Sequence, residues 1–139
     1  MQYKRFNNKI VLRLEIGEDI IEKVLELAKL EHIKLASVTG IGACDYVKIG
    51  AFKVAEKKYY ANEYNEEMEM TSLVGNLTTK DGVEYLHLHA NFAGVNGNAV
   101  GGHLNCARVS ATAEIFVDIV DGVVEREVNS VTGLNVFKF

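Results

Sequence analysis

The sequence predicts an α+β domain in which a twisted, mainly antiparallel β-sheet packs against one main α-helix. Only one stretch has apolar residues at helical spacing, whereas most of the remaining chain alternates apolar and polar residues as strands do. Asp-Gly pairs between extended segments predict antiparallel hairpins. At 139 residues, with 48% hydrophobic and 24% charged residues, the chain has the composition of one globular domain spanning residues 1–139.

The N-terminal part predicts a strand followed by the helix. Alternate residues from Ile10 to Ile16 are apolar, which indicates one buried strand face. Gly17 breaks this pattern, and we expect it to cap the helix that follows. From Ile20 to Leu30 the apolar residues move to helical spacing and charged residues fill the other face. An amphipathic helix of about three turns, packed by one side onto the sheet, is therefore expected.

The chain after the helix is rich in predicted strands. Residues 35–54 are expected to form two strands, with Gly40, Gly42 and Gly50 at bends or bulges. The pairs Asp81-Gly82 and Asp121-Gly122 each predict the turn of a hairpin. We expect about seven strands, mostly joined as hairpins.

Charge is unevenly distributed and limits the classes of partner. Residues 1–80 carry 12 basic and 12 acidic side chains, while residues 81–139 carry 3 basic and 7 acidic ones, which accounts for the whole net charge of −4. An acidic half repels a phosphate backbone and suits a cation. No apolar run approaches the roughly 20 residues of a membrane span, and the N-terminal residues lack an export signal. Cys44 and Cys106 do not make a disulfide framework, so we expect reduced thiols and a cytoplasmic location.

Three of the four histidines lie within residues 87–103. In the predicted strand from Val83 to Phe92 the even-numbered residues from Leu86 onward are apolar, so His87 and His89 are expected on the opposite, polar face. Alternate residues on one face lie about 7 Å apart, close enough for two imidazoles to bind one ion. Gly101 and Gly102 precede His103 and allow a close backbone approach. The pattern favours a metal site formed by the three histidines, and zinc is the ion we expect first. The alternative is that these histidines are structural or solvated.

A fourth ligand is left open. Glu114 shares its strand face with other polar residues and could serve as a ligand, as an orienting partner or as a solvated carboxylate. Cys106 follows His103 by three residues and could supply a thiolate, although free cysteines are more often small buried residues. With three protein ligands only, the remaining position would take water or a small anion.

Several motifs in this order resemble the PPC domain (plants and prokaryotes conserved). The resemblance runs from about Tyr3 to Phe137 and rests on LRLEIGEDIIEKVLELAKLEHIKLASVTGIGAC, TSLVGNLT, DGVEYLHLHA and VGGHL. It implies a sheet packed on a helix and assembly as a homotrimer. Prokaryotic members resemble this chain in their H-L-H and G-G-H motifs, which supports His87, His89 and His103 as ligands of zinc or a similar divalent ion.

Three functions follow as hypotheses. The first is a trimeric metal-binding protein, as a small-molecule binder or an enzyme of undefined class. The second is a DNA-binding protein, as the family label implies, although the chain has no proline and so lacks the Arg-Gly-Arg-Pro core of the AT-hook that binds DNA in plant members. The third is an oligomeric scaffold with a structural metal, in which exposed residues such as Phe137 and Phe139 contact other subunits.

Overall fold

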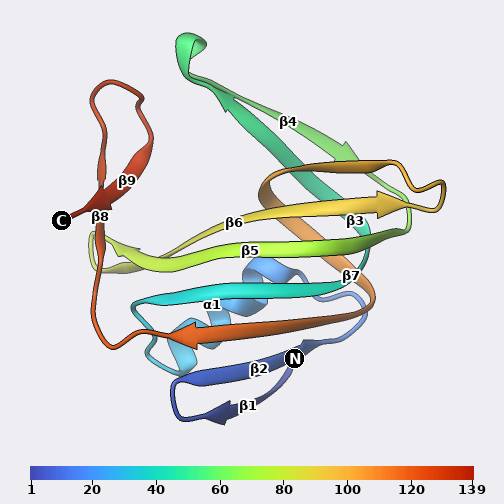
Figure 1. Cartoon of the computed structure of the whole chain (residues 1–139), viewed down its shortest axis with the longest axis horizontal. Helices are drawn as coiled ribbons and strands as arrows, with labels where there is room; N and C mark the ends of the chain where they lie inside the picture. The colour runs from blue at the N-terminus through green and yellow to red at the C-terminus, as the bar shows by residue number, and fades with distance from the viewer.

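The structure, a computed structural model, describes all 139 residues and contains nine strands and one α-helix (Figure 1). The elements are β1 (Gln2–Phe6), β2 (Lys9–Leu14), α1 (Ile20–Leu30), β3 (Ala36–Lys53), the 3₁₀ helix η1 (Val54–Glu56), β4 (Lys58–Tyr64), β5 (Met68–Lys80), β6 (Val83–Gly94), β7 (Ala99–Ile119), β8 (Glu125–Val128) and β9 (Asn135–Lys138).

All nine strands belong to one sheet, and its centre is a closed ring. β3 pairs with β5, β5 with β6, β6 with β7 and β7 with β3, each in the antiparallel sense. The β1–β2 hairpin extends the sheet from β7, β4 extends it from β3, and β8–β9 lies beside β5. The only parallel pairing joins Thr79 of β5 to Glu125 of β8. The predicted α+β class with a mainly antiparallel sheet is therefore confirmed, in a more β-rich form than expected.

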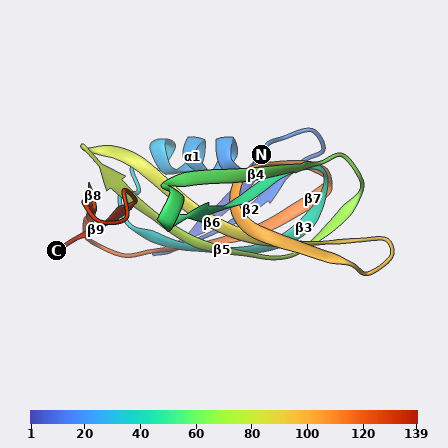
Figure 2. The same cartoon turned by 90° about the horizontal axis from the view of Figure 1, so that it is seen from above.

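Helix α1 covers one face of the sheet, as Figure 2 shows. Its buried residues are Ile20, Val24, Leu27 and Ala28, all on the predicted apolar face. They join a core of 26 buried residues, all of which except Ile33 lie in the helix or in strands. The structure contains no helix with the length and hydrophobicity that a membrane crossing requires.

The residue that caps α1 is Asp19, so the prediction of Gly17 was wrong. One carboxylate oxygen of Asp19 accepts a hydrogen bond from the Glu22 backbone N–H at 3.0 Å, and the other accepts from the Ala107 N–H of β7 at 2.9 Å. Asp19 therefore satisfies a free N–H at the start of the helix and also ties the helix to β7. Gly17 instead forms the preceding turn with a φ of 85°.

Two other predictions are corrected by long-range pairing. Residues 36–53 form one long strand, β3, whose register shifts between Gly40 and Gly42 and again further along, so the glycines mark irregularities within a strand. Asp81 and Gly82 do form a tight hairpin turn, with φ values of 53° and 78°. Asp121 and Gly122 do not, because the chain leaves β7 there and crosses to β8 beside β5.

Candidate metal centre

Strand β6 places two histidines on its polar face, as the sequence predicts. Leu88, Ala90 and Phe92 are buried in the core, and Leu86 packs against it. The alternation of a strand then directs His87 and His89 to the opposite side, where His87 is half-buried and His89 is exposed. The core side chains thus fix the orientation of both imidazoles.

The third histidine comes from the neighbouring strand. His103 of β7 is the register partner of His89 in the antiparallel β6–β7 ladder, so the two side chains project from the same face. The glycines before His103 allow this packing: a Cβ on Gly102 would lie 2.6 Å from the Gly50 carbonyl oxygen of β3, and one on Gly101 would lie 2.1 Å from Asn91 Oδ1. The predicted close backbone approach is confirmed.

The three imidazoles meet in one cluster. The Nε2 atoms of His87 and His89 are 3.2 Å apart, and one ring nitrogen from each of the three histidines lies within 4.8 Å of the others. Ring centroids are separated by 5.1 Å for His87–His89, 5.1 Å for His87–His103 and 5.6 Å for His89–His103. The structure therefore brings together all three residues that the sequence singles out.

The surroundings of His87 and His103 favour the neutral form of their imidazoles. Burial lowers the pKa of His87 to about 4, and repulsion from His103, His89 and Arg126 adds to this effect. Burial also lowers the pKa of His103, with a further contribution from His89. Because a metal binds the unprotonated ring nitrogen, both histidines are available as ligands at neutral pH.

Neither protein candidate for a fourth ligand joins this cluster. Glu114 is exposed on β7, opposite Arg13 and Ile41 of the two flanking strands. Cys106 is half-buried opposite Lys48, and burial raises the pKa of its thiol, which disfavours the thiolate. Of the alternatives from the sequence, water or a small anion fits this arrangement.

Tyr59 of β4 contacts the cluster and was missed in the sequence. Its ring stands edge-on to His103 with centroids 5.8 Å apart, and its hydroxyl donates to Asn105 Oδ1 at 2.6 Å. The same hydroxyl lies 3.3 Å from the His103 carbonyl oxygen. Nothing in the local pattern marks Tyr59, because its position depends on the pairing of β4 with β3.

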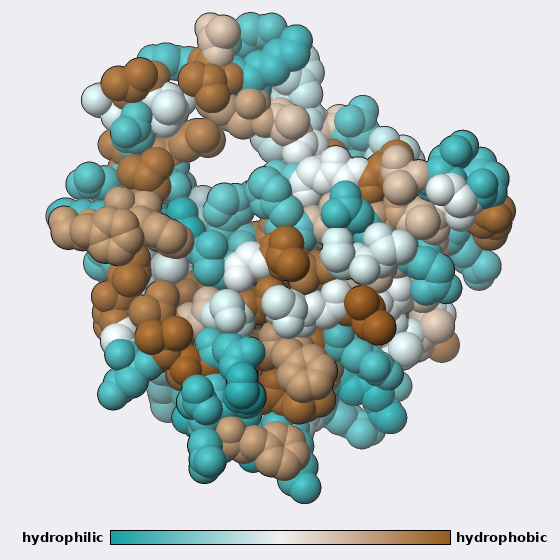
Figure 3. Space-filling view, viewed as in Figure 1, coloured by the Kyte–Doolittle hydropathy of each residue, from teal (hydrophilic) through white to brown (hydrophobic).

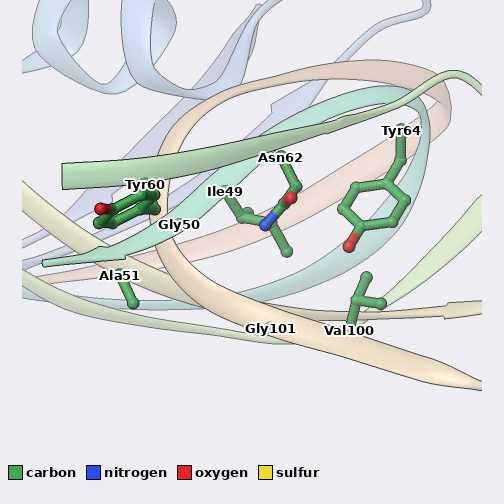
Figure 4. A pocket seen from close by; sticks show the side chains of 8 residues that line it. All are labelled: Ile49, Gly50, Ala51, Tyr60, Asn62, Tyr64, Val100 and Gly101. Carbon is green, nitrogen blue, oxygen red and sulfur yellow. The ribbon is translucent and has the colours of Figure 1, made fainter. Parts of the chain in front are cut away.

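A cavity of about 350 Å³ lies between β4, β3 and the segment of β7 that carries Val100 (Figure 4). Gly50, the register partner of His103, and Gly101 form part of its wall. Figure 4 shows Asn62 and Tyr64 directed from β4 toward the segment of β7 that carries Val100. None of the three histidines lines this cavity, so it is not part of the candidate metal centre.

The amino-acid sequence of this chain matches the model of a known protein family. The profile of the Plants and Prokaryotes Conserved (PCC) domain, the family abbreviated PPC above, covers residues 1–121. The chain belongs to this family. None of the curated proteins matches it.

Solved structures with the PPC fold are similar over almost the whole chain. A candidate DNA-binding protein from Bacteroides thetaiotaomicron is 28% identical, with a TM-score of 0.97 and coverage of 99% of this chain and 96% of that one. A metal-containing protein from Archaeoglobus fulgidus is 28% identical, with a TM-score of 0.88 and coverage of 100% and 99%. A PPC protein from Pyrococcus horikoshii is 29% identical, with a TM-score of 0.88 and coverage of 99% and 94%.

Proposed function

We propose that this PPC protein binds one divalent metal ion, zinc in the first place, through His87, His89 and His103. The observation that carries the proposal is the 3.2 Å separation of the His87 and His89 Nε2 atoms. Two nitrogens bound to tetrahedral zinc at about 2.0–2.1 Å lie roughly 3.3 Å apart. The metal-containing relative from Archaeoglobus fulgidus gives independent support, since it shares the fold along its whole length.

The donor set fits such an ion. Three imidazoles from two paired strands are held at one point, and the pKa of His87 and of His103 is lowered, so these rings do not have to lose a proton at neutral pH. Three protein ligands leave a position for water or a small anion, and a bound ion there would supply Lewis-acid chemistry. The chain's own residues orient the ligands: the β6 core side chains fix two rings, and Tyr59 packs against the third.

Metal analysis of variants tests this proposal. Protein purified without an affinity tag is expected to contain about one zinc per chain by mass spectrometry. His87→Ala, His89→Ala or His103→Ala should each lower that content sharply, because two imidazoles alone hold zinc weakly. His32→Ala is the matched control, since His32 is exposed and outside the cluster. Unchanged zinc in the three cluster variants would show that the assignment is wrong.

DNA binding is the second candidate, because the relative from Bacteroides thetaiotaomicron carries that label. The net charge of −4 opposes it, since non-specific DNA binding depends on basic side chains that replace counterions. We therefore expect no retention of duplex DNA at low salt in a mobility-shift assay. Binding that weakens steeply with added salt would instead favour this candidate.

The third candidate is an oligomeric scaffold whose metal is structural. We propose that the chain assembles as a homotrimer in the cytoplasm, where both cysteines remain free thiols as in the structure. β8 and β9 form a C-terminal hairpin, and its exposed apolar residues support subunit contacts. This candidate differs from a binding or catalytic centre in the effect of metal removal. A structural ion is required for assembly of the trimer, whereas an ion with an open coordination position is not.

A further inference from the structure

One buried cation in this molecule has no acidic partner. Arg126 of β8 is 6% exposed, and all three of its hydrogen-bond acceptors are uncharged. The guanidinium donates from Nε to Thr78 Oγ1 at 2.8 Å, from Nη1 to the Asn135 carbonyl at 2.9 Å and from Nη2 to Asn76 Oδ1 at 2.7 Å. Guanidinium has five N–H groups, so one remains free on each terminal nitrogen.

Two aromatic rings hold the plane of this guanidinium. Its central carbon lies 4.7 Å from the ring centroid of Tyr85 and 4.6 Å from that of Phe137. The rings of Tyr85 and Phe137, together with the three hydrogen bonds of the guanidinium, restrict rotation of the guanidinium. Arg126 is therefore held in a fixed orientation, which reduces the entropy lost when it binds a further partner.

Arg126 lies next to the histidine cluster along the polar face of β6. Asn76, which accepts the bond from Nη2, is the register partner of His87 in the β5–β6 ladder. Tyr85, which stacks on the guanidinium, precedes His87 by two residues and so shares its face. The charge of Arg126 also contributes to the lowered pKa of His87. Asn76 and Tyr85 thus place the cation on the same sheet face as His87.

A purely structural role does not account for the charge. Attachment of the C-terminal hairpin to β5 could be achieved by a neutral donor, whereas removing a full charge from water is costly unless an opposite charge balances it. The chain itself supplies no such charge to Arg126, and burial lowers its pKa accordingly. An anionic ligand would supply it, and a planar guanidinium with a free N–H on each terminal nitrogen suits a carboxylate or phosphate.

We infer that Arg126 binds the oxyanion group, carboxylate or phosphate, of a ligand that occupies the open position of the three-histidine centre. The inference rests on the proposed metal site and names the class of ligand for it. Arg126 lies beyond residues 1–121, the part matched by the family profile, so the C-terminal hairpin supplies this subsite.

Calorimetric titration tests the inference with two probes, acetate and inorganic phosphate, each added to zinc-loaded and to chelator-treated protein. Arg126→Lys keeps the charge without the planar fork and should weaken binding of the preferred probe about tenfold or more, which is a change of at least about 1.4 kcal/mol. Arg126→Gln should weaken it further. Arg108→Gln is the matched control, because Arg108 is exposed and paired with Asp45. Whichever probe binds more tightly identifies the oxyanion as carboxylate or phosphate.

Zinc content, measured on the same samples, separates this inference from the metal proposal. Normal zinc with weakened oxyanion binding in both Arg126 variants supports the inference, and wild-type affinity in both variants, or no binding of either probe to wild type, overturns it. If wild type holds no zinc, the metal proposal fails, and with it the placement of the ligand at a metal; the chelator-treated titrations then decide whether Arg126 binds an oxyanion without the ion. Should both variants misfold, the Arg126 Nε–Hε resonance of wild type decides: it must shift with added acetate or phosphate, and an unmoved resonance overturns the inference.

Discussion

At the scale of single residues, the candidate metal centre consists of three imidazoles without an acidic side chain among them. Their cluster contains no carboxylate, and burial together with mutual repulsion favours the neutral form of His87 and His103. Their common orientation was predictable from strand alternation, since the apolar residues of β6 fix which face is buried. The environment of Arg126 was not, because a lone arginine between two glutamates in a strand pattern indicates a solvated side chain.

The lowered pKa of His87 predicts a pH dependence of stability in metal-free protein. The folded state keeps His87 neutral down to a pKa of about 4, whereas an unfolded chain protonates it near the ordinary value of 6.5. Between these values the unfolded state binds more protons, so the free energy of unfolding should fall as the pH is lowered from 6.5 toward 4. Urea denaturation in the presence of a chelator measures this trend.

His87→Gln provides the comparison for that trend, because it removes the titrating ring and keeps a polar side chain at the half-buried site. The variant should lose part of the decrease in stability between pH 6.5 and 4. Identical pH profiles for wild type and His87→Gln would contradict the assigned pKa.

At the scale of secondary-structure elements, the site depends on the close approach of β6, β7 and β3. His103 is the register partner of both His89 and Gly50, so the packing of three strands positions one ligand. The helix and the turn at Asp81-Gly82 were predictable because their signals are local. The single long β3 and the crossing after β7 were not, because they follow from pairings between distant segments. β1 was missed because all five of its residues are exposed and give no hydrophobic pattern.

Gly102→Ala tests this dependence on strand packing. The added Cβ would lie 2.6 Å from the Gly50 carbonyl oxygen, a backbone atom that cannot move without displacing β3. We expect a loss of about 1–3 kcal/mol in the free energy of unfolding and a roughly tenfold or greater loss of zinc affinity. Denaturation and zinc titration with a competing chelator measure the two effects.

Gly94→Ala is the matched control for that substitution. Gly94 ends β6, and a Cβ there would meet only side-chain atoms at 3.5 Å and 3.7 Å, which is ordinary contact. Its zinc affinity should equal that of wild type. If Gly102→Ala also bound zinc normally, close strand packing would not be what positions His103.

At the scale of the whole molecule, the apolar surface of the C-terminal hairpin requires an explanation. Figure 3 shows hydrophobic residues gathered over β8, β9 and the segment that precedes them. The exposed apolar side chains of this region are Val120, Val123, Val128, Val131, Leu134, Phe137 and Phe139. A continuous exposed apolar surface on a small protein is typical of a contact with another chain. We therefore expect this surface to form a subunit contact in the proposed homotrimer.

Light scattering coupled to size exclusion tests the assembly. The expected mass is three times the chain mass of 15.4 kDa. With three protein ligands per site and an open fourth position, we expect the same mass after the metal is removed with a chelator. Dissociation of the trimer by the chelator would instead favour the scaffold with a structural metal, and a monomer in both conditions would contradict the proposed assembly.

The most direct test of the metal centre is a crystal structure of untagged, chelator-free protein with anomalous data collected on both sides of the zinc edge. Our account predicts one anomalous peak per chain, about 2.0–2.1 Å from a ring nitrogen of each of His87, His89 and His103. Absence of a peak between these rings, or a peak bound by other residues, would contradict it.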